Sequence, residues 1–223
     1  MMFFLKIISK LSIKKLYLKS DFLHFLIYDL FSFLKLYRNK IVTINLKKSF
    51  PKKDKKWLKT TKRNFYSNFL DTLFEIIKLI EFKKSDIIKR VDVSNPELIT
   101  NEIKSKKSII ILSSHYNNWE WLFCRISILV EKNIYAPYKP LSNIFFNKLL
   151  IGLRQKFGGK VIKMSSFSKF MIKNQNEGSI YFLLNDQVPL NTKNMQKYNF
   201  LERKTAFYQG AEKLRKEKMP IFY

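Results

Sequence analysis

One of the two histidines, His115, stands five residues before Glu120 in the stretch SSHYNNWEW, residues 113–121. An imidazole beside a carboxylate can act as a general base, because the carboxylate fixes the tautomer of the ring and stabilises the imidazolium that forms. The spacing therefore points to proton abstraction from a hydroxyl group. It also fits an ordinary helix start, with Glu120 favoured by the helix dipole and Asn117 or Asn118 as the cap.

The elements around His115 would place it at the edge of a sheet. The run SIIIL, Ser108–Leu112, predicts a buried strand, and a helix is predicted to begin near Trp119. His115 then lies on a strand-to-helix loop at the carboxyl end of a strand, where α/β proteins commonly place their sites. A serine nucleophile at Ser113 or Ser114 is less well supported, because no G-x-S-x-G elbow is present.

Short β-rich runs alternate with helical stretches from residue 95 onward, and Gly158, Gly159 and Gly178 stand where a helix should end. This alternation predicts an α/β fold with a mostly parallel central sheet and helices on both faces. The further predicted strands are 134–138, 160–163, 179–184 and 220–223. The predicted helices are 119–130, 144–157, 166–176 and 202–216.

The N-terminal part predicts a membrane-associated helix. Residues 21–37 place polar side chains, His24 among them, on one narrow arc of a helical wheel and apolar side chains on the rest. The segment is shorter than the roughly 20 residues of a spanning helix, and Asp29 and Lys35 interrupt it. It suits a helix lying in a membrane interface, while an amphipathic helix docked on its own domain is the alternative. His24 is expected to have no chemical role.

A basic run follows in KKSFPKKDKKWLKTTKR, residues 47–63, which holds nine Lys and Arg and one acid. Beside an amphipathic helix, such a run is typical of binding to an anionic membrane surface, although a solvated charge run is the alternative. A long helix is predicted from about 55 to 80. We expect a membrane-associated segment over 1–45 and a catalytic domain over 46–223, incomplete at its C-terminus because the strand-like MPIFY comes last.

The net charge of +26 could suggest nucleic-acid binding, but only 7 of the 43 basic residues are arginine and the lysines are spread along the chain. We therefore expect no nucleic acid as partner. The single cysteine, Cys124, excludes an internal disulfide and lies in an apolar helical run, which predicts a buried, inert thiol. One Cys and two separated His do not make a zinc site, and no metal or cofactor is expected. Lys6 and Lys10 interrupt any signal-peptide core.

A set of motifs in fixed order resembles one family, the bacterial lipid A biosynthesis acyltransferases (lauroyl/myristoyl acyltransferases). The motifs are LYRNKIVTINLKKSFP, HYNNWEW, YKPLSN, RQKFGGKVI, LLNDQVP and FLERKTAFYQGAEKLRKE. The resemblance covers about Leu36 to Tyr223. The H-x4-E element alone is short and is shared with glycerolipid acyltransferases. Those enzymes would be expected to show an F-P-E-G-T-R-like block where this chain has LLNDQVP.

The resemblance implies a glycerolipid-acyltransferase-like fold and a membrane-bound acyltransferase. A fatty acyl group would pass from acyl carrier protein, or coenzyme A, to a hydroxyl of a lipid A precursor, at the cytoplasmic face of the cell inner membrane. His115 would take the hydroxyl proton, and Glu120 would orient and charge-balance His115. An acyltransferase acting on another membrane lipid, such as a lysophospholipid or an aminolipid, remains an alternative. A non-enzymatic basic membrane-binding protein is another.

Five further residues match family positions that line the site: Lys139, Asn143, Arg154, Asp186 and Gln187. The resemblance implies that they bind substrate, with Lys139 and Arg154 as the cations beside the His115–Glu120 pair that meet the acceptor phosphates. Lys139 replaces the arginine of the family's Y-R-P block, so the bidentate fork for phosphate is lost there. The alternative role is an Asx turn for Asn143 and a surface cation for Arg154. For Asp186 and Gln187 it is a turn at the end of a strand.

Overall fold

The computed structural model describes residues 38–223 except 106, 132, 190–194 and 209–218. The chain divides into two compact units. The first comprises the described parts of Met1–Glu81 and Leu190–Phe207, and the second those of Phe82–Pro189 and Tyr208–Tyr223. The predicted helix over 21–37 lies outside the described residues, as does His24. The domain boundary at 45/46 stays a prediction.

The second unit is built on a five-stranded sheet in the order β3-β2-β4-β1-β7. Every neighbouring pair in it is parallel, which confirms the predicted α/β class with a mostly parallel sheet. The strands are β1 Ile109–Ser113, β2 Ile134–Tyr138, β3 Lys160–Lys163, β4 Ile180–Leu184 and β7 Ile221–Phe222. The chain leaves β1 and returns to the sheet at β2, but β4 later takes the place between them.

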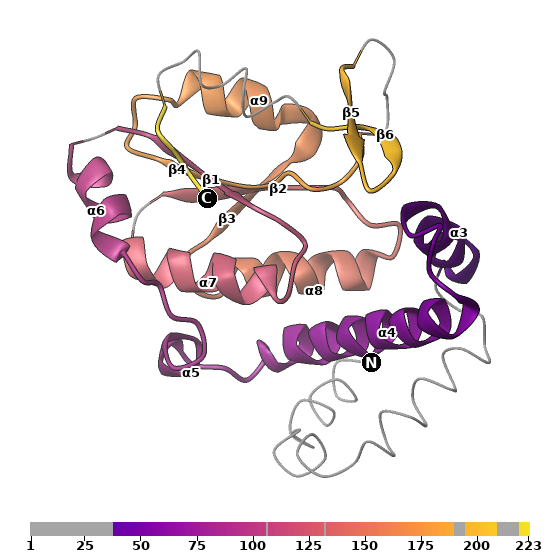
Figure 1. Cartoon of the computed structure of the whole chain (residues 1–223). Helices are drawn as coiled ribbons and strands as arrows, with labels where there is room; N and C mark the ends of the chain where they lie inside the picture. Colours follow the sequence, from indigo (N-terminus) through magenta and orange to yellow (C-terminus); the bar gives the residue numbers. More distant parts are fainter. Residues whose placement is uncertain (1–37, 106, 132, 190–194, 209–218) are drawn as a thin grey trace. The chain divides into compact units, whose positions relative to one another are not determined.

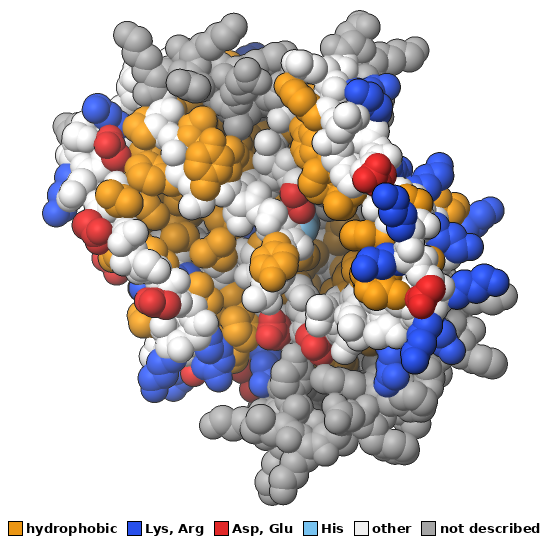
Figure 2. Space-filling view, in the orientation of Figure 1, with side chains coloured by type: hydrophobic (Ala, Val, Ile, Leu, Met, Phe, Trp, Pro, Cys, Tyr) orange, Lys and Arg blue, Asp and Glu red, His pale blue; other side chains and the backbone are white. Residues whose placement is uncertain are grey.

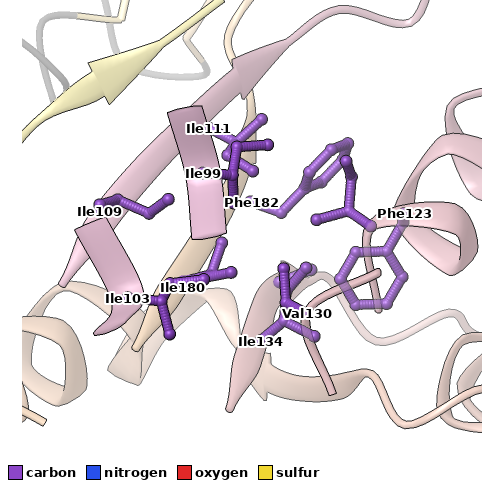
Figure 3. Close-up of a cluster of buried hydrophobic side chains, with 11 residues drawn as sticks. Ile99, Ile103, Ile109, Ile111, Phe123, Val130, Ile134, Ile180 and Phe182 are labelled. Carbon is purple, nitrogen blue, oxygen red and sulfur yellow. The ribbon is translucent and has the colours of Figure 1, made fainter. Parts of the chain in front are cut away.

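Helices cover both faces of this sheet, with α7 and α8 on one face and α9 on the other (Figure 1). Alternate residues of β1 pack into the hydrophobic layers on the two faces of the sheet. Ile109 and Ile111 pack with Phe123 of α7 (Figure 3), whereas Ile110 packs with Phe167 of α9. The helices among the described residues of this unit are α5 Lys84–Ile88, α6 Pro96–Lys104, α7 Trp119–Val130, α8 Ile144–Gln155 and α9 Met164–Lys173.

Local chemistry sets the ends of the two helices nearest the site. Asn118 caps α7 by accepting a hydrogen bond from the backbone N–H of Trp121 at 3.0 Å, so of the two predicted caps the structure uses the second. After α8, Gly158 has φ +98°, a conformation that favours glycine. A Cβ at Gly159 would collide with the ring of Phe123, so only glycine lets this turn approach α7.

The described part of the first unit holds two helices and a β-hairpin: α3 Asn39–Ser49, α4 Lys55–Lys78, β5 Lys197–Phe200 and β6 Arg203–Ala206. Asp54 caps α4, the long helix that the sequence predicts. The helix predicted over 202–216 is wrong in its first part, because residues 203–206 pair with β5 as an antiparallel strand. Residues 209–216 lie outside the described residues. No helix in the described part of the chain is long and apolar enough to cross a membrane.

Candidate active site

Strand register brings His115 and Asp186 together. β1 and β4 are parallel neighbours, and Ser113 lies opposite Leu184. His115 and Asp186 each come two residues after that pair, so both lie just beyond the same edge of the sheet. The backbone N–H of His115 donates to Asp186 Oδ2 at 3.0 Å, and His115 Nδ1 lies 2.8 Å from Asp186 Oδ1. Both side chains keep part of their surface exposed, 29% for His115 and 38% for Asp186. His115 is thus held at two points by one carboxylate and remains accessible.

Glu120 makes a different pair. It is the second residue of α7, and its side chain, only 6% exposed, points to Arg154 on α8. Arg154 Nε donates to Glu120 Oε2 at 2.8 Å, and Arg154 Nη2 donates to Glu120 Oε1 at 2.6 Å. This is a bidentate ion pair, the strongest geometry for arginine and a carboxylate.

The structure therefore corrects the expected contact between His115 and Glu120. Glu120 is held within the layer of α7 and α8 by the guanidinium of Arg154, while the carboxylate that reaches His115 comes from the neighbouring strand. A signal for this arrangement was present in the sequence. Asp186 directly follows a predicted strand, and carboxyl ends of parallel strands meet at one edge of a sheet.

Trp119 connects the two pairs. Its ring meets the imidazole of His115 edge to face, with 4.8 Å between the ring centroids and 66° between the planes. Its indole Nε1–H donates to Glu120 Oε1 at 3.1 Å. One side chain thus touches the ring of His115 and the buried carboxylate. Sequence reasoning missed this role of Trp119, because a tryptophan in the first turn of an apolar helix is usually core.

Burial and charge act together on the groups below His115. Burial by itself would lower the pKa of Arg154, but the hydrogen bond and the negative charge of Glu120 outweigh it and raise that pKa. Burial, and then the charge of Glu120, raise the pKa of the Cys124 thiol to about 12. Cys124 is fully buried, so the thiol is neutral and shielded at physiological pH, as the sequence predicts.

The remaining predicted residues fall into two groups. Lys139 and Gln187 are exposed. Lys139 follows β2, whose register against β4 places it at the same carboxyl edge as His115, and Gln187 follows Asp186 directly. Asn143 is also exposed, but its side-chain oxygen caps α8 by accepting a hydrogen bond from the backbone N–H of Phe146 at 3.1 Å. Arg154 is occupied by Glu120.

The sheet edge offers proton-transfer chemistry. His115 is the only histidine in the described part of the chain, and histidine surface is visible in the space-filling view (Figure 2). Within the described ranges, no group of three or more His, Cys, Asp and Glu side chains could hold a metal ion. The arrangement is that of an accessible imidazole with an aligned carboxylate, above a buried ion pair.

The chain matches the family model described as bacterial lipid A biosynthesis acyltransferase over residues 1–220. It belongs to that family. The resemblance seen in the sequence is confirmed, and with it the assignment of the chain as an acyltransferase with a lipid A acyltransferase activity in general. The family is membrane-associated in general. No curated protein matches the chain.

Proposed function

We propose that this acyltransferase moves a fatty acyl group from acyl carrier protein, or coenzyme A, to a hydroxyl of a lipid A precursor, with His115 as general base. The observation that carries the proposal is the His115–Asp186 pair at the carboxyl edge of the sheet, in a chain of this family. A general base of this kind supplies about 10²–10⁴-fold in rate. Positioning and oxyanion stabilisation supply the rest.

Asp186 determines which nitrogen of the ring is available. A carboxylate only accepts hydrogen bonds, so the proton between the two groups sits on Nδ1 of His115. Nε2 then carries a lone pair and takes the proton of the acceptor hydroxyl. The alkoxide attacks the thioester carbonyl, the C–S bond breaks, and the thiolate leaves with the carrier. The proton taken up by Nε2 passes to the thiolate, and no acyl-enzyme forms.

Glu120 has an indirect part in this mechanism. We assign the orientation and charge balance of the imidazole to Asp186, because both of its oxygens contact His115. Glu120 acts through Trp119, which it holds by a hydrogen bond and which packs on the ring of His115. Arg154 holds Glu120 in place, so its guanidinium fork is not free for an acceptor phosphate.

Lys139 is then the cation for the acceptor headgroup. It is exposed at the same sheet edge and forms no ion pair with any residue that the structure describes. Its ammonium offers a phosphate a point charge where the family's arginine would offer two parallel hydrogen bonds. Gln187 and the free amide hydrogens of Asn143 are further donors for substrate.

The acceptor alternative is another membrane lipid, such as a lysophospholipid or an aminolipid. The lysine at position 139 favours this candidate, since it lacks the fork that suits a phosphorylated sugar. In either case the reaction would take place at the cytoplasmic face of the inner membrane, where the basic run 47–63 meets anionic lipid.

The test is acyl transfer by the purified full chain, followed by mass spectrometry of the lipid products. Lipid A precursor and lysophospholipid are offered in parallel, each with acyl carrier protein or coenzyme A as thioester. We expect acylated lipid A precursor from the unaltered chain and none from His115→Ala. Exclusive acylation of lysophospholipid would show that the proposed acceptor is wrong, but it would leave the proposed role of His115 as general base unchanged. Undiminished transfer by a folded His115→Ala chain would remove His115 as the base.

A further inference from the structure

Helix α3 of the first unit has an outward face that mixes apolar and cationic side chains. None of its eleven residues is buried. Ile41 and Ile44 are 50% and 40% exposed, and the exposed Lys48 lies one turn beyond Ile44 on the same face. Short helices are marginal in water unless an apolar face is packed against something. Helix α3 contacts α4, so it does not need a further partner in order to fold, but Ile41 and Ile44 remain accessible to one.

The β5–β6 hairpin of the same unit ends in a second exposed apolar group. Tyr198, Phe200 and Leu201 are each between 45% and 51% exposed. Leu201 and Glu202 form the turn with φ +48° and +59°, the left-handed region that hairpin turns normally fill with Asn and Gly. A leucine there places a large aliphatic side chain at the tip, at a cost in backbone strain of about 1–3 kcal/mol.

A hydrogen bond fixes the hairpin to α3. Arg203 Nη1 donates to Asn45 Oδ1 at 2.9 Å, and Asn45 lies beside Ile44 on the helix. The exposed apolar side chains of both elements therefore belong to one surface, named here the α3–hairpin surface: Ile41, Ile44, Tyr198, Phe200 and Leu201. Figure 1 shows the two elements of this unit.

Charge identifies the occupant of the α3–hairpin surface. The two elements and their turn carry six cations, Lys40, Lys47, Lys48, Lys197, Arg203 and Lys204, against one acid, Glu202. Of the hairpin cations, Arg203 shares the face of Tyr198 and Phe200, whereas Lys197 and Lys204 project from the opposite face. Large apolar side chains with cations nearby suit the interface of an anionic bilayer, because the apolar groups enter the acyl boundary and the cations meet the headgroups. A soluble protein partner would have to be strongly acidic to match them.

We propose that the α3–hairpin surface is a membrane-docking site, with the tip at Phe200 and Leu201 inserted into an anionic lipid interface. This contact does not depend on the chemistry of His115. The unit that contains the basic run would thus bind the membrane through the tip of the β5–β6 hairpin. Removing Phe200 or Leu201 should lower partitioning onto anionic vesicles roughly tenfold for each side chain that was buried in lipid.

The chain offers a clean way to observe the tip. Its one cysteine, Cys124, is fully buried with a pKa of about 12, so a thiol-reactive dye leaves it unlabelled in the folded protein. An environment-sensitive dye on Leu201→Cys reports the tip alone. The matched control is Leu98→Cys on α6, where a leucine of similar exposure, 52%, stands beside Glu97.

Both labelled chains are mixed with phosphatidylglycerol/phosphatidylcholine vesicles, and the bound chain is measured by sedimentation. We expect blue-shifted emission at position 201, quenched by nitroxide-labelled lipid, with little change at position 98. The same response should appear with His115→Ala, which separates this proposal from the catalytic one. A dye at 201 that stays in water while the chain is vesicle-bound would overturn the proposal. So would a response to acyl carrier protein without lipid, which would make the surface a carrier-docking site.

Discussion

Two carboxylate pairs lie close together around the loop after β1, and they differ in exposure. Asp186 and His115 each keep about a third of their side-chain surface in contact with solvent, whereas Glu120 is nearly sealed against Arg154. An accessible pair can exchange a proton with a substrate, because its hydrogen-bonding capacity is not exhausted. The buried pair is fully engaged and serves to hold α7 against α8. A carboxylate can thus be available for proton transfer in one environment and serve packing in the other.

The largest expected effect is on the accessible pair. His115→Ala should reduce turnover about 10³-fold, because the proton acceptor is lost, while the thermal unfolding temperature stays near that of the unaltered chain. The measurement is single-turnover acyl transfer together with calorimetry. Ser113→Ala and Ser114→Ala serve as controls and should retain turnover. A collapse of activity in either serine variant, with the fold intact, would revive the serine nucleophile.

The buried pair should respond in stability. Glu120→Ala leaves the guanidinium of Arg154 buried without its partner, so the free energy of unfolding should fall by about 3 kcal/mol. Urea unfolding measures this. The matched control is Lys107→Ala, which removes an ion pair whose lysine is 65% exposed and should cost less than about 1 kcal/mol. Equal losses of unfolding free energy in the two variants would show that the buried ion pair contributes no more to stability than the exposed one.

Asp186→Ala tests whether the accessible carboxylate is the one that orients His115. Turnover should fall about 10²-fold, since the ring loses its fixed tautomer and its counter-charge. The two losses should not add in the double variant with His115→Ala, because the residues act as a unit. Fully additive losses, or an Asp186→Ala chain that transfers acyl groups normally, would return the orienting role to Glu120.

Trp119 tests whether the two pairs are coupled. Trp119→Phe keeps an aromatic ring against His115 but loses the hydrogen bond to Glu120, so turnover should fall only a few-fold and stability by about 1 kcal/mol. Trp119→Leu removes the aromatic packing as well and should reduce turnover roughly tenfold, with KM little changed. If both variants lose the same activity, the ring contact with His115 contributes nothing.

The smallest effect is expected at the acceptor cation. Lys139→Ala should raise the KM for a phosphorylated acceptor about fivefold, the scale of one exposed charge contact, and leave the KM for the thioester unchanged. Lys139→Arg restores the fork and should hold or lower the acceptor KM. Steady-state kinetics with each substrate varied in turn will show this. A rise in the thioester KM instead would assign Lys139 to the carrier-docking surface.

Much of the second unit was predictable because its signals are local. β2, β3 and α7 have the bounds that the sequence predicts, since apolar runs bounded by Asn or Gly specify an element without reference to the rest of the chain. The β5–β6 hairpin was not predictable in this way. Leu201 and Glu202 carry none of the Asn-Gly signal of a tight turn, and the charged run that follows reads as a helix.

What the sequence by itself determined is the chemistry on offer: an α/β chain with His115 after a strand, Glu120 in a first turn, and the ordered motifs of an acyltransferase family. Only the tertiary structure decided which carboxylate meets the imidazole. That choice depends on β4 pairing beside β1, between strands that are adjacent in the chain, and on α8 delivering Arg154 to Glu120. Strand order and helix packing are long-range outcomes of burial, whereas a spacing of five residues is a property of the chain alone.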